Sequence, residues 1–220
     1  MREAFREELT ALTERLVEMT RFVGTAMDKA TQALLQADLP LAESVISADD
    51  AVNRLQHEFD QRAIGLIARQ QPVATDLRTL VTGLRMAADL ERMGDLAVHL
   101  AKVARLKYPS RVVPEELRDT IGAMSRVAQD LAAKAGQVIR ERDVELAVQM
   151  ERDDDEMDRL HRTLFQLMLA KDWSHGIETA VDVTLCGRYY ERFADHAVSV
   201  ARRVVYLVTG EYDATAAGAV

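Results

Sequence analysis

Cysteine, proline and aromatic residues are all scarce in this sequence. Its 220 residues include one cysteine, four prolines and ten glycines, and aromatic residues make up 5%. A single cysteine, Cys186, excludes an intrachain disulfide framework and is typical of a reducing compartment. Few prolines and glycines leave long stretches in which nothing interrupts a helix. With charged residues at 29%, the composition is typical of an α-helical protein with long helices.

Signals for membranes and nucleic acids are also missing. The sequence contains no stretch of about 18 uncharged apolar residues, so we expect no membrane-spanning helix. Its first residues lack the apolar run of a signal peptide. The net charge of −8 and the pI near 5.2 argue against broad electrostatic contact with nucleic acids or anionic lipids. We therefore expect a cytoplasmic protein that binds no nucleic acid and reaches a membrane only through a partner.

The short motifs that mark common enzymatic sites are absent as well. The sequence contains no G-x-x-x-x-G-K, G-x-G-x-x-G, C-x-x-C or H-E-x-x-H. It also lacks Glu-x-x-His, the spacing used on the helices of ferritin-like di-iron carboxylate enzymes. Cys186 has no activating arrangement in view, which favours a buried structural thiol. Because no nucleophile with a neighbouring base is evident, we expect no enzymatic activity.

Apolar residues recur at steps of three and four along most of the chain, which predicts helices. The first helix is expected from about residue 3 to 36. After a break at Asp38, which can cap a helix, the second is expected from Pro40 or Leu41 to about Arg69. The third follows the loop RQQPVATD and ends near Lys107. No strand-like alternation appears.

The second half of the chain repeats the first. A shift of 105 places the predicted fourth and fifth helices on the first and second, and DDEMDRL on DDAVNRL, whereas the third helix of each half aligns at a shift of 100. We attribute this difference to a longer second loop in the first half. The sequence thus predicts an all-α fold of six long helices in two tandem three-helix bundles. The expected boundaries are 1–108 and 116–212 for the repeats, 109–115 for a linker and 213–220 for a flexible tail.

Acidic residues interrupt the apolar pattern of both third helices. Glu91 and Asp95 occupy the two missing steps of a stripe through Leu77, Leu80, Leu84, Ala88 and Val98. Glu191 and Asp195 lie 100 positions later, in ERFADHAV against ERMGDLAV, on a stripe through Ile177, Val181, Thr184 and Val198. A carboxylate that faces a core costs several kcal/mol unless it is paired, hydrogen-bonded or bound to a metal. The doubled pattern therefore predicts a functional or structural role for these acids.

Further candidate ligands lie on the second helix of each half. Asp49 and its counterpart Asp154 can meet the paired acids, and oxygen ligands without cysteine suit hard cations, iron or manganese. His99 can add a nitrogen, but its counterpart is Ser199. Two other interpretations stay open: ion pairs between the acids and nearby arginines, and ordinary surface charge. The candidate pairing residues are Arg85, Arg92, Arg188 and Arg192.

Several of these features together resemble the PhoU family of bacterial phosphate-uptake regulators. They are the two three-helix repeats, the string PVATDLRTL before the third helix, and the pair DLERMGDLA and YYERFADHAV. The resemblance implies two three-helix bundles, each with metal ligands on its third helix. Carried over by position, it assigns metal binding to Glu91, Asp95, Glu191 and Asp195, and then to Asp49 and Asp154. It implies iron, zinc or another divalent ion (manganese, magnesium or calcium) and leaves the identity open.

The chain departs from the family pattern at a few positions near these acids. Asn53 stands where the family tends to have Asp, and His99 and Ser199 stand where it often has Asn. These departures affect above all the first-half site.

The same resemblance implies a regulatory role without catalysis. The chain is expected to act as an adaptor between the phosphate ABC transporter, through its ATPase subunit, and a sensor histidine kinase with its response regulator. It would restrain phosphate uptake and the phosphate-starvation response, and it is expected to form a homodimer. The rival interpretations are a carboxylate-bridged metalloenzyme and a metal-free helical scaffold.

Overall fold

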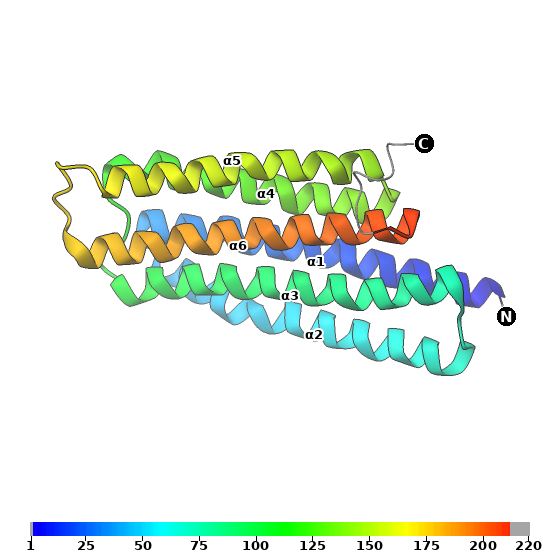
Figure 1. The fold of residues 1–220 in the computed structure, drawn as a ribbon. Coiled ribbons are helices and arrows are strands. Elements are labelled where there is room, and N and C mark those ends of the chain that lie inside the picture. The colour runs from blue at the N-terminus through cyan, green and yellow to red at the C-terminus, as the bar shows by residue number, and fades with distance from the viewer. Residues whose placement is uncertain (1, 212–220) are drawn as a thin grey trace.

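A computed structural model describes residues 2–211, and the predicted tail at 213–220 lies outside the described residues. The described part contains six α-helices, one 3₁₀ turn and no β-strand. All six helices run roughly parallel to one long axis (Figure 1). In chain order the elements are α1 (Arg2–Gln36), α2 (Leu39–Gln70), α3 (Ala74–Lys107), η1 (Glu115–Leu117), α4 (Arg118–Glu141), α5 (Val144–Met168) and α6 (Gly176–Thr209). The predicted all-α fold is confirmed.

The helix starts follow local chemistry that the two halves share. Asp38 caps α2, with its Oδ1 accepting a hydrogen bond from the backbone N–H of Leu41 at 2.9 Å. Asp143 caps α5 in the same way, accepting from the N–H of Leu146 at 2.9 Å. Each cap satisfies one of the free N–H groups at a helix start. Pro40 stands in the first turn of α2, where its missing N–H costs nothing.

The structure corrects where the two halves differ in length. The loop between α2 and α3 spans only residues 71–73, and α3 starts at Ala74, inside the predicted loop. The first half is longer because α2 has 32 residues and α5 has 25. The prediction of a longer second loop was therefore wrong. α2 continues for about two more turns than its counterpart, up to Gln70, and Pro72 follows two residues later.

The two three-helix units pack on each other through equivalent helices. α1 contacts α4 and α3 contacts α6, and both contacts are antiparallel (Figure 1). On α1, Thr20 lies opposite Gly136 and Gly24 opposite Ala132, so residue numbers rise on one helix as they fall on the other. Antiparallel contacts between equivalent helices relate the units by an approximate two-fold rotation.

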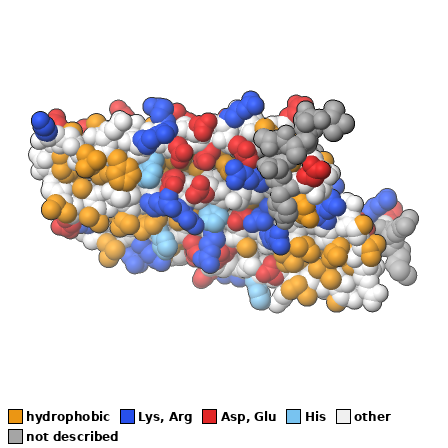
Figure 2. Space-filling model, viewed as in Figure 1, with side chains coloured by type: hydrophobic (Ala, Val, Ile, Leu, Met, Phe, Trp, Pro, Cys, Tyr) orange, Lys and Arg blue, Asp and Glu red, His pale blue; other side chains and the backbone are white. Residues whose placement is uncertain are grey.

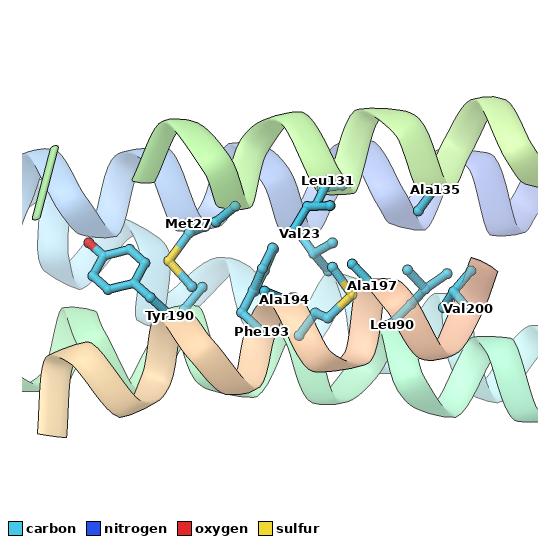
Figure 3. Close-up of a cluster of buried hydrophobic side chains, with 14 of the residues drawn as sticks. Val23, Met27, Leu90, Leu131, Ala135, Tyr190, Phe193, Ala194, Ala197 and Val200 are labelled. Carbon is cyan, nitrogen blue, oxygen red and sulfur yellow. The ribbon is translucent and has the colours of Figure 1, made fainter. Parts of the chain in front are cut away.

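A single hydrophobic core continues through both units. Figure 3 shows Met27 of α1, Leu90 of α3, Leu131 of α4 and Phe193 of α6 converging on one cluster. Beside them the hydroxyl of Tyr190 shares a 2.7 Å hydrogen bond with Oγ1 of Thr31, which satisfies two buried polar groups across the units. The units therefore cannot separate without exposing core residues to water.

The segment between the units is also tied to the core. Residues 108–114 are irregular and contain a cis peptide bond between Tyr108 and Pro109. Val112 and Val113 are nevertheless 4% and 2% exposed and belong to the core cluster. This connection is an anchored turn, not a free tether.

Candidate functional site

The structure places Glu91 and Asp95 beside the core, not within it. Their side chains are 26% and 31% exposed. The predicted stripe was right at Leu80 and Val98, which are buried, and wrong at Leu77, which is 37% exposed, and at Ala88, which lies on the surface. From Leu80 the buried face of α3 continues through Met86, Leu90, Met93, Ala97, Leu100 and Ala104. Packing against α1, α2 and α6 together selects this face.

The same correction applies to α6. Ile177 and Val181 are 85% and 52% exposed, so they do not belong to a buried stripe. Glu191 is partly buried and Asp195 is exposed. On the face drawn in Figure 2, charged side chains gather along the middle of the molecule, with apolar side chains toward both ends.

The first acidic cluster joins Asp49 of α2 to Glu91 and Asp95 of α3. Oδ1 of Asp49 lies 3.6 Å from the point that a Cβ on Gly94 would occupy, so the two helices approach closely here. Burial and the nearby charge of Asp95 raise the pKa of Asp49, against a 3.1 Å hydrogen bond from Nδ2 of Asn53. Burial and Asp95 likewise raise the pKa of Glu91. The three carboxylates repel one another.

The second acidic cluster has the same arrangement with stronger repulsion. Burial, followed by the charges of Asp195 and Asp158, raises the pKa of Asp154 to about 6. Asp155 and Glu191 add smaller contributions in the same direction. The structure therefore brings together the predicted residues of each half, Asp49 with Glu91 and Asp95, and Asp154 with Glu191 and Asp195.

Arginines offset part of this negative charge, as the ion-pair interpretation predicted. Arg92 Nη1 lies 3.0 Å from Oδ2 of Asp95, and its Nε lies 3.7 Å from Oε2 of Glu91. Arg188 pairs with Glu191 in the second cluster. Both arginines are about half exposed or more, so each pair contributes roughly 0–1 kcal/mol. Such pairs do not remove the repulsion from neighbouring acids that, together with burial, raises the pKa of Asp154.

The donor atoms of both clusters fit a hard cation, since they are carboxylate oxygens whose mutual repulsion the arginines relieve only in part. As the side chains stand in residues 2–211, no three His, Cys, Asp or Glu are placed to hold one metal ion. The clusters therefore provide the charge for a cation, and ligation would require carboxylate rotamers to change. His99 does not join the acids, because its ring packs against Tyr189 with centroids 5.4 Å apart.

Sequence reasoning missed a charged network that lies between the two clusters. Asp89 of α3 is 9% exposed and contacts two residues of α6. Its Oδ1 lies 3.1 Å from Nδ1 of His196, and its Oδ2 accepts a 2.6 Å hydrogen bond from Nε of Arg203. Burial alone would raise the pKa of Asp89, but the hydrogen bonds from His196 and Arg203 outweigh it and lower the pKa. The network joins the two units across their interface.

The sequence carried one faint signal for this network. Asp89 opens the motif on α3, while its counterpart on α6 is Tyr189, so the two copies differ at this position. The partners in α6 lie 107 and 114 residues further on, a separation that only the packing of α3 on α6 brings into contact.

Two further features are the burial of Cys186 and the polarity of the helices. Cys186 is fully buried, and burial raises the pKa of its thiol, which fits an inert structural residue. No helix in the described residues is long and apolar enough to cross a membrane.

Fold and site together define a class: an all-α protein of two fused three-helix units, each with an acidic cluster at an equivalent place. Residues 16–104 and 121–204 both match the model of the PhoU domain. The chain belongs to the PhoU family, which confirms the resemblance seen in its sequence.

Curated relatives match over nearly the whole chain. The phosphate-specific transport system accessory protein PhoU homolog 2 of Mycobacterium tuberculosis is 50% identical over 212 residues, 96% of this chain and 100% of the relative. PhoU homolog 1 of Mycobacterium leprae is 49% identical over 212 residues, 96% of each chain.

Solved structures agree with the fold. PhoU from Pseudomonas aeruginosa superposes with a TM-score of 0.82 at 28% identity, covering 94% of this chain and all of that one. The phosphate transport system regulatory protein PhoU from Streptococcus pneumoniae gives a TM-score of 0.84 at 25% identity, covering 95% and 99%.

Proposed function

We propose that this chain is an accessory protein of the phosphate-specific transport system that negatively regulates phosphate uptake and the phosphate-starvation response. The observation that carries this proposal is the 50% identity over 212 residues to a Mycobacterium tuberculosis protein named phosphate-specific transport system accessory protein PhoU homolog 2. In the proposed role the chain works in the cytoplasm as an adaptor between the transporter ATPase and a sensor histidine kinase with its response regulator. Such a role uses helix faces for docking and needs no catalytic centre.

Gene deletion tests the regulatory role. In phosphate-rich medium, loss of the gene should switch on phosphate-starvation genes, and a plasmid copy should restore repression. Mycobacterial relatives carry the labels homolog 1 and homolog 2, so any second copy is deleted in the same strain. Normal repression in that strain would contradict the proposal.

Binding assays test the adaptor role and the proposed homodimer. The purified chain should bind the transporter ATPase subunit or the cytoplasmic part of the sensor kinase, and light scattering after gel filtration should give twice the mass of 24.6 kDa. Failure to bind either partner at micromolar concentrations would argue against an adaptor, whatever the oligomeric state.

We also propose that the two acidic clusters bind divalent or iron ions that brace the bundles. The support is the second cluster, where burial and then repulsion from four neighbouring acids raise the pKa of Asp154 to about 6, since a cation would relieve that repulsion. Glu91, Asp95 and Asp49 would provide oxygen ligands in one unit, and Glu191, Asp195 and Asp154 in the other. Mn²⁺ added to chelator-treated protein should raise its Tm, and Glu191→Gln with Asp195→Asn should reduce that rise. An unchanged Tm with Mn²⁺, Fe²⁺ and Zn²⁺ would count against the clusters as metal sites.

The same measurement separates the rival interpretations. A metal-free helical scaffold predicts no metal above background in untagged protein. A carboxylate-bridged oxidase predicts metal together with oxygen consumption, which the proposed role does not require.

A further inference from the structure

The two units differ where the first helix of each meets the second. A groove of about 130 Å³ lies between α1 and α2 and is also lined by residues of α3; it is here named the α1–α2 groove. Its lining is mostly apolar and includes Phe22, Ala26, Val45, Val52, Gly94 and Val98. Exposed Thr25, Lys29 and Ser44 add polar groups along its opening, and Asp49 borders it. Phe22 is 40% exposed, so an aromatic face also lies open to solvent here.

The second unit fills the same place with its own side chains. Three small residues of the groove, Ala26, Val45 and Val52, have larger counterparts at the positions 105 residues later. These counterparts are Leu131, Met150 and Met157, and all three are fully buried. The extra methylene and methyl groups occupy the volume that the first unit leaves open.

The second unit also provides ion-pair partners for the lysine at the equivalent position. Lys134, the counterpart of Lys29, lies 2.9 Å from Oδ2 of Asp153 on α5 and also pairs with Asp130 on α4. In the first unit the two acids are replaced by Ala48 and Thr25. Among the described residues Lys29 has no hydrogen bond or ion pair. The first unit therefore lacks both the aliphatic filling and the carboxylates that its twin contains.

The size of the groove decides what kind of occupant fits. Sites for whole small-molecule ligands enclose roughly 300–1,000 Å³, which is well above this volume. A cavity of about 150 Å³ holds a benzene-sized group. The α1–α2 groove thus matches one large apolar side chain, the usual size of an anchor at the centre of a protein interface.

We propose that the α1–α2 groove binds a partner protein through one leucine- or phenylalanine-sized anchor side chain, with a neighbouring carboxylate of the partner on Lys29. The chemistry of the partner follows from the second unit, where an aliphatic side chain and two carboxylates occupy the equivalent place. This inference rests on the proposed adaptor function and names a surface for it. A short amphipathic helix that presents an apolar residue one turn from an acid has the required pattern.

Filling the groove from within tests the proposal. Ala26→Leu copies the residue of the second unit and should weaken binding of the transporter ATPase or the sensor kinase at least about tenfold, because the anchor loses its space. Ala48→Asp copies Asp153, gives Lys29 an internal partner and should weaken binding about two- to fivefold. Calorimetry or biolayer interferometry on the full-length chain measures both effects.

A matched control separates the groove from a general charge effect. Ala68→Asp places the same new charge on an exposed position of α2 outside the groove and should leave binding unchanged. Circular dichroism and Tm check that each variant folds, and Ala48→Asp provides a surface variant should Ala26→Leu fail to fold. Equal binding by the wild type, Ala26→Leu and Ala48→Asp would overturn the proposal while leaving the adaptor function intact.

A small probe tests the groove independently of any partner. 4-Methylvalerate carries a leucine-like branch and a carboxylate, and NMR should show shifts at Val45 and Val52 in the wild type. Ala26→Leu should abolish these shifts, and the neutral amide of the probe should bind about two- to fivefold more weakly. If neither partner binds the wild type, the adaptor function is contradicted. The probe then tests independently whether the groove binds an apolar group next to a carboxylate. Absence of NMR shifts in the wild type would overturn the proposed binding in the α1–α2 groove.

Discussion

The two three-helix units share a topology but distribute volume differently. In the first unit a Cβ on Gly83 would lie 2.7 Å from Cζ of Phe59, so the large ring depends on the missing side chain. At the counterpart positions the second unit has Leu164 and Val183, a smaller residue on one helix and a larger one on the other. At this helix contact the two units conserve the summed volume of the pair more closely than the identity of either residue.

The units also distribute charge differently. Asn53 borders the first acidic cluster, where its amide donates to Asp49, whereas the second cluster has Asp158 at the equivalent position. Replacing an amide donor by a carboxylate removes a hydrogen bond and adds a repulsive charge. Burial is the largest cause of the raised pKa at both Asp49 and Asp154, and this exchange adds to the shift at Asp154.

The largest predicted effect concerns the network between the units. Asp89→Ala should lower the free energy of unfolding by about 3 kcal/mol at pH 7, since it leaves Arg203 partly buried without its partner carboxylate. Because the folded pKa of Asp89 is lowered, its contribution is present above its unfolded pKa and is lost as pH falls through its folded pKa. Urea unfolding at pH 7 and at about pH 3 should therefore show the difference between variant and wild type shrinking in acid.

An exposed ion pair serves as the control for that measurement. Glu151→Ala removes a 2.6 Å contact with Arg202, whose side chain is 59% exposed, and should change stability by less than about 1 kcal/mol. A similar loss in both variants would contradict the special role of the buried network.

The next effect tests the exchange of volume between the units. Gly83→Val, the residue of the second unit, should cost about 2 kcal/mol, because its Cβ would lie 2.7 Å from Cζ of the buried Phe59 and force the ring to shift. Adding Phe59→Leu completes the second unit's pair and should recover at least half of the loss. Thermal unfolding of the two single variants and the double variant measures the coupling. Additive losses would contradict the complementary packing.

The smallest effect is a gain in stability at the second acidic cluster. Burial and neighbouring acids give folded Asp154 a pKa of about 6, so the folded state binds its proton more tightly than the unfolded state. Stability is therefore lost as pH rises from about 4 to 6. In chelator-treated protein Asp154→Asn should add about 1–2 kcal/mol at pH 8 and nothing at pH 4. Asp49→Asn should increase the free energy of unfolding at pH 8 by less than Asp154→Asn does. An equal gain would contradict the stronger repulsion in the second cluster.

Helix number, the repeat and the starts of α2 and α5 were predictable from the sequence, because they depend on local chemistry, whereas the start of α3 was not. Apolar steps of three and four persist for many turns, and the capping residues Asp38 and Asp143 mark helix starts in both halves. The doubled acidic motif also pointed to the right neighbours, since Asp49 and Asp154 do face the predicted acids. Whether metal binds there stays a prediction.

Tertiary structure alone decided which helical face is buried and which distant residues meet. A long helix such as α3 shows apolar residues on several faces, and the choice among them depends on its neighbours, so Leu77 is exposed and Leu90 is not. The contact of Asp89 with Arg203 spans 114 residues and needs the units to pack on each other. The α1–α2 groove has the same origin. Side chains from three helices line it, and no local sequence pattern predicts how they meet.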